Sequence, residues 1–293
     1  MNIPIILAVT YVAMMAAKPL RRLALCMTPW FIFGAVYSLL GLWPNYRVNP
    51  VDVAGLYDAE KHLFGIAVGH TDMLGAASAC PGTASDILTS GLLIPGEYFA
   101  VHHAAWADFL AGLFYMSWVP VPLIFAFAMF FTGHAEWTRR FSWCWLCVNI
   151  LGFIGYYIHP AAPPWYAMNY GFDVITGTPG NTAALARFDA MTHLGIFHAL
   201  YGQNSNVFAA VPSLHAAYPI ITLTYAILSR RRWWVCALLA VLCPGIWCTA
   251  VYTGHHYTID VLLGISTAIV GITLFESVRW AIRRKRITRT TNS

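Results

Sequence analysis

Charged residues are scarce in this chain. Lys and Arg number 17 and Asp and Glu 12 among 293 residues, so 10% of the chain is charged while 59% is hydrophobic. A water-soluble globule cannot bury that much apolar surface or cover itself with so few charges. The composition therefore excludes a soluble protein and indicates a polytopic membrane protein, because a bilayer needs charge only at loops and headgroups.

The chain also lacks the marks of a disulfide framework and of a nucleic-acid-binding surface. Its seven cysteines are an odd number, and all but Cys80 fall inside apolar segments. The net charge of +5 comes from short basic clusters beside apolar runs, where they act as topology signals. Because no basic region precedes the first apolar segment, we expect a membrane helix there and no cleaved signal peptide.

Apolar stretches of about 18 to 22 residues predict seven membrane helices, of which the first is short. They are expected over 3–17, 23–43, 110–131, 141–158, 208–229, 233–253 and 258–275. Pro120 and Pro122 interrupt the third and Pro244 the sixth, which membrane helices tolerate because neighbours re-satisfy the freed carbonyls. The predicted fold is an all-α polytopic bundle of six or seven transmembrane helices.

Basic residues and histidines gather at opposite ends of this predicted bundle. Only Arg47, Lys61 and Arg187 fall on the side that carries ten of the eleven histidines, all but His134, and ten of the twelve acids. The positive-inside rule makes the other side cytoplasmic. We expect an integral protein of the cell or inner membrane with its active site on the extracytoplasmic face. The cytoplasmic side receives Lys18, Arg21, Arg22, Arg139, Arg140, Arg230, Arg231, Arg232, Arg279, Arg283, Arg284, Lys285, Arg286 and Arg289, which are 14 of the 17 basic residues.

Two long segments, 44–108 and 159–206, lie on the predicted outer side. The first is mildly amphipathic, so part of it is expected on the membrane surface. It is either a structural cap or a lid that helps to hold a lipid headgroup. Its apolar residues are Val51, Val53, Leu56, Leu63 and Phe64, set against Asp52, Asp58, Glu60 and Lys61.

Three outer stretches can carry chemistry: 159–166, 211–218 and 254–260. The first, HPAAPPWY, would alone be an aromatic belt with a rigid proline turn. The second contains His215, and a lone histidine in an apolar helix is more often structural than catalytic. In the third, His256 and Asp260 are one helical turn apart and share a face, where an ionised carboxylate needs a partner.

Helix lengths bring His215 to the same place. From His215 the chain descends about 20 Å to Arg230, at roughly 1.5 Å per residue, and the next span climbs about 30 Å before His256. Two imidazoles and a carboxylate then share one cavity near the outer surface. That set suits phosphoryl transfer with a covalent intermediate, in which Asp260 orients His256, His256 attacks phosphorus and His215 protonates the departing oxygen.

Two other readings of these residues remain open. His215, His255, His256 and Asp260 could ligate zinc, although thiol ligands are absent and phosphate chemistry does not require a metal here. The chain could instead be a transporter with a proton relay, but its ionisable residues cluster at one face and no inverted repeat is visible. We expect no metal and no soluble cofactor.

The three motifs resemble the phosphatidic acid phosphatase type 2 superfamily of membrane lipid phosphatases and phosphotransferases. That family pairs a Pro-Ser-Gly-His stretch with a later His-x3-Asp, matched here by residues 212–215, with Leu214 in place of glycine, and by His256 and Asp260. Within it, residues 162–166 and 255–260 are most similar to inositol phosphorylceramide synthases. The likeness covers about 157–264, and the first 100 residues match loosely.

The sequence departs from the parent family at two basic positions. The family has a lysine before an Arg-Pro pair, and here His159-Pro160 stands near that pair with no lysine before it. Ala250 stands where the family has an arginine six residues before the nucleophile. A phosphodiester carries one negative charge and needs fewer cations than a monoester, so the losses favour a diester substrate. Arg187, His159 and His255 are the remaining candidates to steady that charge, and Arg187 could equally be a solvated loop residue.

The resemblance implies a membrane phosphotransferase that moves a headgroup phosphate, with phosphoinositol favoured, from a phospholipid donor to a ceramide-type acceptor and releases diacylglycerol. The alternative is a lipid phosphatase that uses water. It also implies two regions: 1–107, with N-terminal membrane helices and the amphipathic segment, and 108–293, with the catalytic core and the basic tail. The oligomeric state stays open. The expected catalytic residues are His215, His256 and Asp260, and the expected substrate-binding residues are His159, Pro163, Trp165, Tyr166, Arg187, Ser213 and His255.

Overall fold

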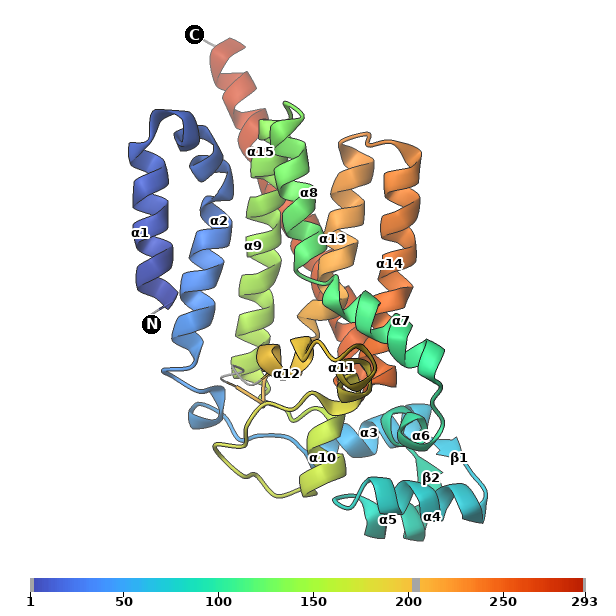
Figure 1. The fold of residues 1–293 in the computed structure, drawn as a ribbon. Helices are drawn as coiled ribbons and strands as arrows, with labels where there is room; N and C mark the ends of the chain where they lie inside the picture. Colours follow the sequence, from blue (N-terminus) through green and yellow to red (C-terminus); the bar gives the residue numbers. More distant parts are fainter. Residues whose placement is uncertain (1–2, 202–205, 292–293) are drawn as a thin grey trace.

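The structure is a computed structural model that describes residues 3–201 and 206–291. Within those residues the regular elements are helices apart from one small ladder of two strands, so the predicted all-α fold class is confirmed. Figure 1 shows the long helices standing side by side, with the smaller elements gathered below one end of them. The long helices are α1 (Ile3–Ala16), α2 (Lys18–Leu40), α7 (Ala105–Met116), α8 (Pro120–Phe131), α9 (Ala135–Ile158), α13 (Leu214–Leu228), α14 (Trp233–Tyr252) and α15 (Thr258–Thr291).

Four of these helices are long and apolar enough to cross a bilayer by themselves: α2, α9, α14 and the part of α15 over Thr258–Lys285. Helices α7 and α8 add a fifth crossing if they are taken as one span bent by 46°. Helices α1 and α13 are apolar but shorter. The chain is therefore a multi-pass membrane protein, and the number of six or seven spans stays a prediction.

Four predicted spans begin five or six residues from the expected position, because α2 begins at Lys18, α7 at Ala105, α9 at Ala135 and α13 at Leu214. Helix α13 begins at Leu214 and not at 208, because Pro212 has no N–H to donate and Ser213 caps the helix with its side chain. Helix α7 begins at Ala105, so the expected division at 107/108 falls inside α7, and that division stays a prediction. The break between α7 and α8 lies just before Pro120, at the first turn of α8.

Aromatic side chains fill the core between α2, α9 and α13. The rings of Trp30 and Trp145 stack with centroids 4.0 Å apart, and Tyr218 packs against Trp145. The Tyr218 hydroxyl donates to Asn149 Oδ1 at 2.6 Å, so these buried polar groups are paired. Because these contacts join α9 to α13, they fix the depth of α13, whose first turn lies next to the smaller elements.

Residues 45–101 form a compact region at that end. It contains η1 (Asn45–Arg47), α3 (Ala54–Phe64), β1 (Ile66–Ala67), α4 (His70–Ala79), α5 (Ala84–Ser90), β2 (Leu92–Leu93) and α6 (Pro95–Val101). Strands β1 and β2 pair antiparallel, with Ile66 opposite Leu93. The remaining elements at this end are α10 (Pro164–Tyr170), η2 (Ala183–Leu185), α11 (Ala186–Thr192) and α12 (Ile196–Tyr201).

The amphipathic pattern of 44–108 does not place its polar residues in solvent. Glu60 is 1% exposed and Lys61 is 9% exposed, whereas Leu63 is 63% exposed. The burial has a cause in each case, since Lys61 pairs with Asp86 and Glu60 binds the start of α15. Glu60 and Lys61 therefore do not form an exposed polar face of this segment, which is built into the protein.

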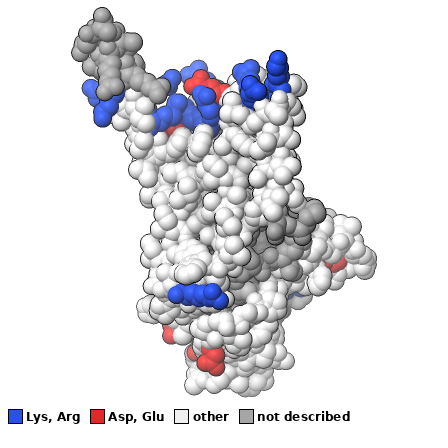
Figure 2. Space-filling model, turned by 90° about the vertical axis from the view of Figure 1, so that its left-hand side faces the viewer, with Lys and Arg blue, Asp and Glu red and all other residues white. Residues whose placement is uncertain are grey.

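Charge divides the molecule into two ends. Figure 2 shows Lys and Arg gathered at one end and a broad wall without Lys, Arg, Asp or Glu between the two ends. Apolar side chains of the long helices, such as Val12, Ile124 and Val241, are more than half exposed, as expected for a surface in contact with lipid. We call the end formed by the α1–α2, α8–α9 and α13–α14 turns and the last part of α15 the basic end. The side chains of Arg286 and Arg289 lie outside the described part of the structure.

Candidate active site

His215, His256 and Asp260 form one chain of hydrogen bonds at the end opposite the basic end. His256 Nε2 lies 3.0 Å from His215 Nδ1, and His256 Nδ1 lies 3.3 Å from Asp260 Oδ2. Asp260 is fully buried and His256 is 6% exposed. An ionised carboxylate only accepts hydrogen bonds, so Nδ1 of His256 carries the proton and Nε2 presents its lone pair. We call these three residues the triad.

The start of α13 is joined directly to the start of α15. The Ser213 N–H donates to the carbonyl of Asp260 at 3.1 Å, and Ser213 Oγ accepts from the N–H of Ala216. The helices approach so closely that a Cβ on Gly264 would lie 2.1 Å from the Ser213 carbonyl oxygen. Ser213, expected to bind substrate, is therefore seen to position His215 beside Asp260, and direct contact with substrate stays a prediction.

Glu60 caps the first turn of α15. Its two carboxylate oxygens accept from the N–H groups of Thr258 at 2.8 Å and Ile259 at 3.1 Å. A third N–H, that of Tyr257, donates to Asp260 Oδ2 at 3.0 Å. Burial raises the pKa of Glu60, and the hydrogen bonds from Thr258 and Ile259 oppose that rise. Both acids thus satisfy N–H groups that a helix start leaves unpaired, and Glu60 holds the turn that carries Asp260.

A tight turn between α14 and α15 orients the two adjacent histidines. Gly254 has φ of +71°, a conformation that favours glycine, and the carbonyl of Ala250 accepts from the N–H groups of both His255 and His256. His255 Nδ1 lies 3.0 Å from Thr253 Oγ1, and its buried Nε2 has no hydrogen-bond partner among the described residues. Burial, followed by the nearby His256, lowers the pKa of His255 to about 3. His255 is therefore neutral and offers a hydrogen bond but no fixed charge to a substrate.

Three aromatic side chains surround the histidines. The Tyr115 ring stacks on His215 with centroids 4.9 Å apart, and the Trp118 ring lies 4.3 Å from His215. The Tyr201 ring lies 4.7 Å from His255. The Tyr115 and Trp118 rings thus enclose the His215 imidazole and fix its orientation. The sequence argument missed all three, because aromatic residues are common along the apolar spans and no spacing separates these from the rest.

Arg187 is held in place beside this aromatic group. Its Nε donates to Asp108 Oδ1 at 2.7 Å, its guanidinium lies 5.4 Å from the Tyr252 ring centre, and its buried Nη2 has no partner among the described residues. Asp108 is seven residues, or about 10 Å along α7, from Tyr115. The next residue, Phe188, packs in a cluster with Tyr115. Arg187 is thus a fixed cation near the triad and is only partly exposed, unlike a solvated loop residue.

The stretch 159–166 lies next to the triad but turns its aromatic residues into the protein. The Trp165 N–H donates to the carbonyl of Gly254 at 2.9 Å, and Trp165 and Tyr166 pack in a buried cluster with Tyr257. The Tyr166 hydroxyl donates to the carbonyl of Asp173 and accepts from Ile175. Pro163 precedes α10 at its start. These residues support the turn that carries His255 and His256, and their direct contact with substrate stays a prediction.

His159 pairs with an acid of the segment that precedes α3. Its Nε2 lies 3.2 Å from Asp52 Oδ2, and its side chain is 49% exposed. The Asp52 backbone joins the same stretch, with its N–H on the carbonyl of Pro160 and its carbonyl on the N–H of Ala162. In the part of the chain that the structure describes, no group of three or more His, Cys, Asp or Glu residues is arranged to hold a metal ion.

Comparison with known proteins finds relatives that match more than half of the chain. A phosphoinositol dihydroceramide synthase of Bacteroides thetaiotaomicron is 50% identical over 270 residues, which are 92% of this chain and 82% of that protein. The inositol phosphorylceramide synthase catalytic subunit of Saccharomyces cerevisiae is 24% identical over 259 residues, 86% of this chain and 55% of that protein. Its counterpart in Schizosaccharomyces pombe is 29% identical over 178 residues, 56% of this chain and 40% of that protein.

One family model also matches more than half of the chain. No solved structure is similar at a significant level. The sequence model of the PAP2 superfamily matches residues 92–274, which include α6 to α14, the first half of α15, and all three members of the triad. The chain belongs to the PAP2 superfamily.

Proposed function

We propose that this protein is a membrane phosphotransferase that moves phosphoinositol from a glycerophospholipid to the hydroxyl of a ceramide-type lipid. The observation that carries the proposal is the triad, in which a buried carboxylate, a nucleophilic imidazole and a second imidazole lie in line. Membership of the PAP2 superfamily and the names of the bacterial and fungal relatives, all synthases of phosphoinositol-bearing ceramides, support this substrate pair.

His256 is the nucleophile in the first half of the reaction. Asp260 accepts from Nδ1, which leaves the lone pair of Nε2 free to attack phosphorus. The donor phosphodiester enters between the two imidazoles and replaces the hydrogen bond that joins His256 to His215. A bond then forms between Nε2 and phosphorus as the bond from phosphorus to the diacylglycerol oxygen breaks.

His215 supplies the proton for that departing oxygen. It lies on the side of phosphorus away from His256, where the Tyr115 and Trp118 rings orient it, and the anionic phosphodiester beside it stabilises its charged form before transfer. In the second half, the neutral His215 takes the proton from the ceramide hydroxyl. The hydroxyl oxygen bonds to phosphorus, the bond to Nε2 breaks, and both histidines return to their starting forms.

Arg187 is the cation that steadies the phosphate. The family's basic positions are replaced here by His159 and Ala250, and His255 is neutral, so Arg187 is the fixed charge that the site retains close to the triad. Its Nη2 is buried and unpaired in the described structure, while Nε is held by Asp108. One cation matches the single charge of a phosphodiester.

The reaction takes place at the extracytoplasmic face. The triad lies at the end opposite the basic end, and basic loops remain on the cytoplasmic side of membranes. The bilayer supplies both lipid partners to this end. Buried aromatic residues around His215 exclude water from the intermediate, which favours transfer over hydrolysis.

The test is a transfer assay with the purified protein in lipid, labelled phosphatidylinositol as donor and dihydroceramide added or omitted. We expect mass spectrometry to detect a phosphoinositol ceramide product only when dihydroceramide is present. Diacylglycerol should form together with that product. His256→Ala should abolish it, and His62→Ala, at an exposed position on α3, should leave it unchanged. Release of headgroup phosphate at the same rate with and without dihydroceramide would establish the phosphatase alternative.

A further inference from the structure

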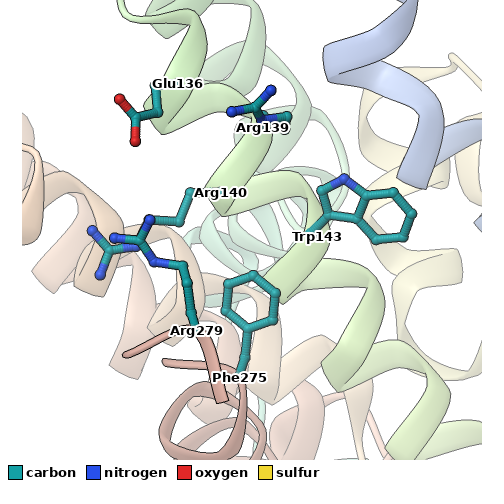
Figure 3. Close-up of a pocket in the computed structure, with 6 residues that line it drawn as sticks. All are labelled: Glu136, Arg139, Arg140, Trp143, Phe275 and Arg279. Atoms are coloured by element: carbon teal, nitrogen blue, oxygen red, sulfur yellow. The ribbon is translucent and has the colours of Figure 1, made fainter. Parts of the chain in front are cut away.

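A second polar site lies at the basic end, far along the bundle from the triad. A cavity of about 190 Å³ opens between α9 and α15 and is lined by Glu136, Arg139, Arg140, Trp143, Phe275 and Arg279. A neighbouring cavity of about 210 Å³ shares three of these residues and adds Arg283. Figure 3 shows the charged side chains toward one side of the first cavity and the two rings toward the other.

One wall of the cavity is fixed by partly buried ion pairs. Arg140 binds Glu276 through two nitrogens, with Nε 2.7 Å from Oε1, and its guanidinium lies 4.6 Å from the Trp137 ring centre. Tyr225 donates to the same carboxylate. Arg279 also lies near Glu276, at 3.4 Å. The site is therefore built from side chains with defined positions.

The cavity carries excess positive charge. Arg139, Arg140, Arg279 and Arg283 line the two cavities, while only Glu136 and the paired Glu276 oppose them. Arg139 and Arg283 have no hydrogen-bond or ion-pair partner among the side chains that the structure describes. Helix α9 begins at Ala135, so the positive end of its dipole lies here as well. Cations gathered in this way bind an anion favourably.

The rings lie one helical turn farther into the bilayer than the guanidinium groups. Trp143 follows Arg139 by four residues on α9, and Phe275 precedes Arg279 by four on α15, so each pair shares a helix face. One turn is about 5 Å along the axis. Trp143 is 40% exposed on this side. A ligand that fits this order has an anionic head at the water boundary and an apolar body directed into the membrane.

We propose that these two adjoining cavities together bind an anionic phospholipid from the leaflet at the basic end. The phosphate contacts Arg139 of the first cavity and Arg283 of the second, and the glycerol and first acyl carbons pack on Trp143 and Phe275. Basic pockets between membrane helices are known to hold anionic headgroups. The site is separate from the triad and does not depend on the proposed transfer reaction. A free phosphate ion shares the headgroup chemistry but would make no use of the rings.

The test is lipid retention measured by native mass spectrometry on protein given equal amounts of phosphatidylglycerol and phosphatidylcholine. We expect preferential retention of phosphatidylglycerol. Arg139→Gln/Arg283→Gln removes both unpaired cations and spares the Arg140–Glu276 pair. At about fivefold per cation, it should weaken that retention by about 25-fold. Arg230→Gln/Arg232→Gln removes the same charge from the α13–α14 turn at the same end and should change it less than threefold.

Three results would overturn the proposal. Equal retention of the two lipids, or equal losses in the two double variants, would show that the cavity is not an anionic lipid site. Displacement of phosphatidylglycerol by 10 mM inorganic phosphate would assign the cavity to free phosphate.

Trp143→Ala should weaken phosphatidylglycerol retention without creating sensitivity to phosphate. A melting temperature like that of the parent protein separates lost binding from lost folding.

Discussion

The Asp260 carboxylate holds the proton arrangement that makes His256 a nucleophile. Asp260→Asn keeps an acceptor for the Tyr257 N–H but cannot stabilise the charge that develops on His256. We expect turnover to fall by about 10²- to 10⁴-fold, in the range of lost acid–base assistance. The donor KM and the melting temperature should change little. Turnover within threefold of the parent protein would remove Asp260 from the mechanism.

His255 should make the protein less stable as pH falls. Its pKa is about 3 in the folded protein, because burial opposes the charged form, and about 6.5 in the unfolded chain. Between these values the unfolded state binds more protons, so the free energy of unfolding decreases as pH drops below about 6.5. His255→Gln removes this contribution. Its melting temperature should fall less than that of the parent protein between pH 7 and pH 5, and equal falls would contradict the burial argument.

Some site residues could be predicted from the sequence and others could not. His215, His256 and Asp260 have chemistry and spacing that point to one place, and the structure brings them together. Trp165 and Tyr166 stand in a motif with the right composition, yet their side chains pack in the core, because sequence does not show which way a side chain points. Such residues need coordinates before they can be assigned.

At the scale of elements, the first turn of α15 depends on a residue almost 200 positions earlier. Glu60→Gln leaves one oxygen to accept a hydrogen bond where the carboxylate offers two, to Thr258 and Ile259. Weaker capping should displace Asp260 and His256 and lower kcat by roughly tenfold, with the donor KM changed less than twofold. Glu60→Asp should restore part of the rate if its shorter carboxylate reaches the helix.

The matched control for Glu60 is Asp58→Asn, at an exposed position on the same helix. It should leave kcat and KM unchanged. A structural role for Glu60 without an effect on the triad would lower the melting temperature in Glu60→Gln but leave kcat intact. That result would contradict the positioning role.

Element boundaries followed local chemistry that hydropathy does not record. Apolar runs located the long helices, but α13 begins at Leu214 because of Pro212 and the Ser213 cap. The burial of Glu60 and Lys61 could not be predicted, because each depends on a partner distant in sequence. Long-range pairing is invisible to a periodicity argument, which assigns polar residues to solvent by default.

At the scale of the whole molecule, the distribution of charge predicts orientation. Asp58→Cys, on α3 near the triad, should react with a membrane-impermeant maleimide in intact cells. Arg232→Cys, on the α13–α14 turn, should react only after the membrane is opened. The parent protein provides the background from its own cysteines, of which Cys248 is exposed. The reverse pattern of labelling would place the triad on the cytoplasmic side.

The most direct measurement of the covalent step is to trap the phosphorylated protein. Purified protein is mixed with phosphatidylinositol labelled at phosphorus, without acceptor, and then quenched in alkali. We expect label on His256 that survives base and is lost in acid. Dihydroceramide added before the quench should remove the label from the protein and carry it in the product. Full transfer activity with no label on the protein at any time, or with label on another residue, would contradict the mechanism.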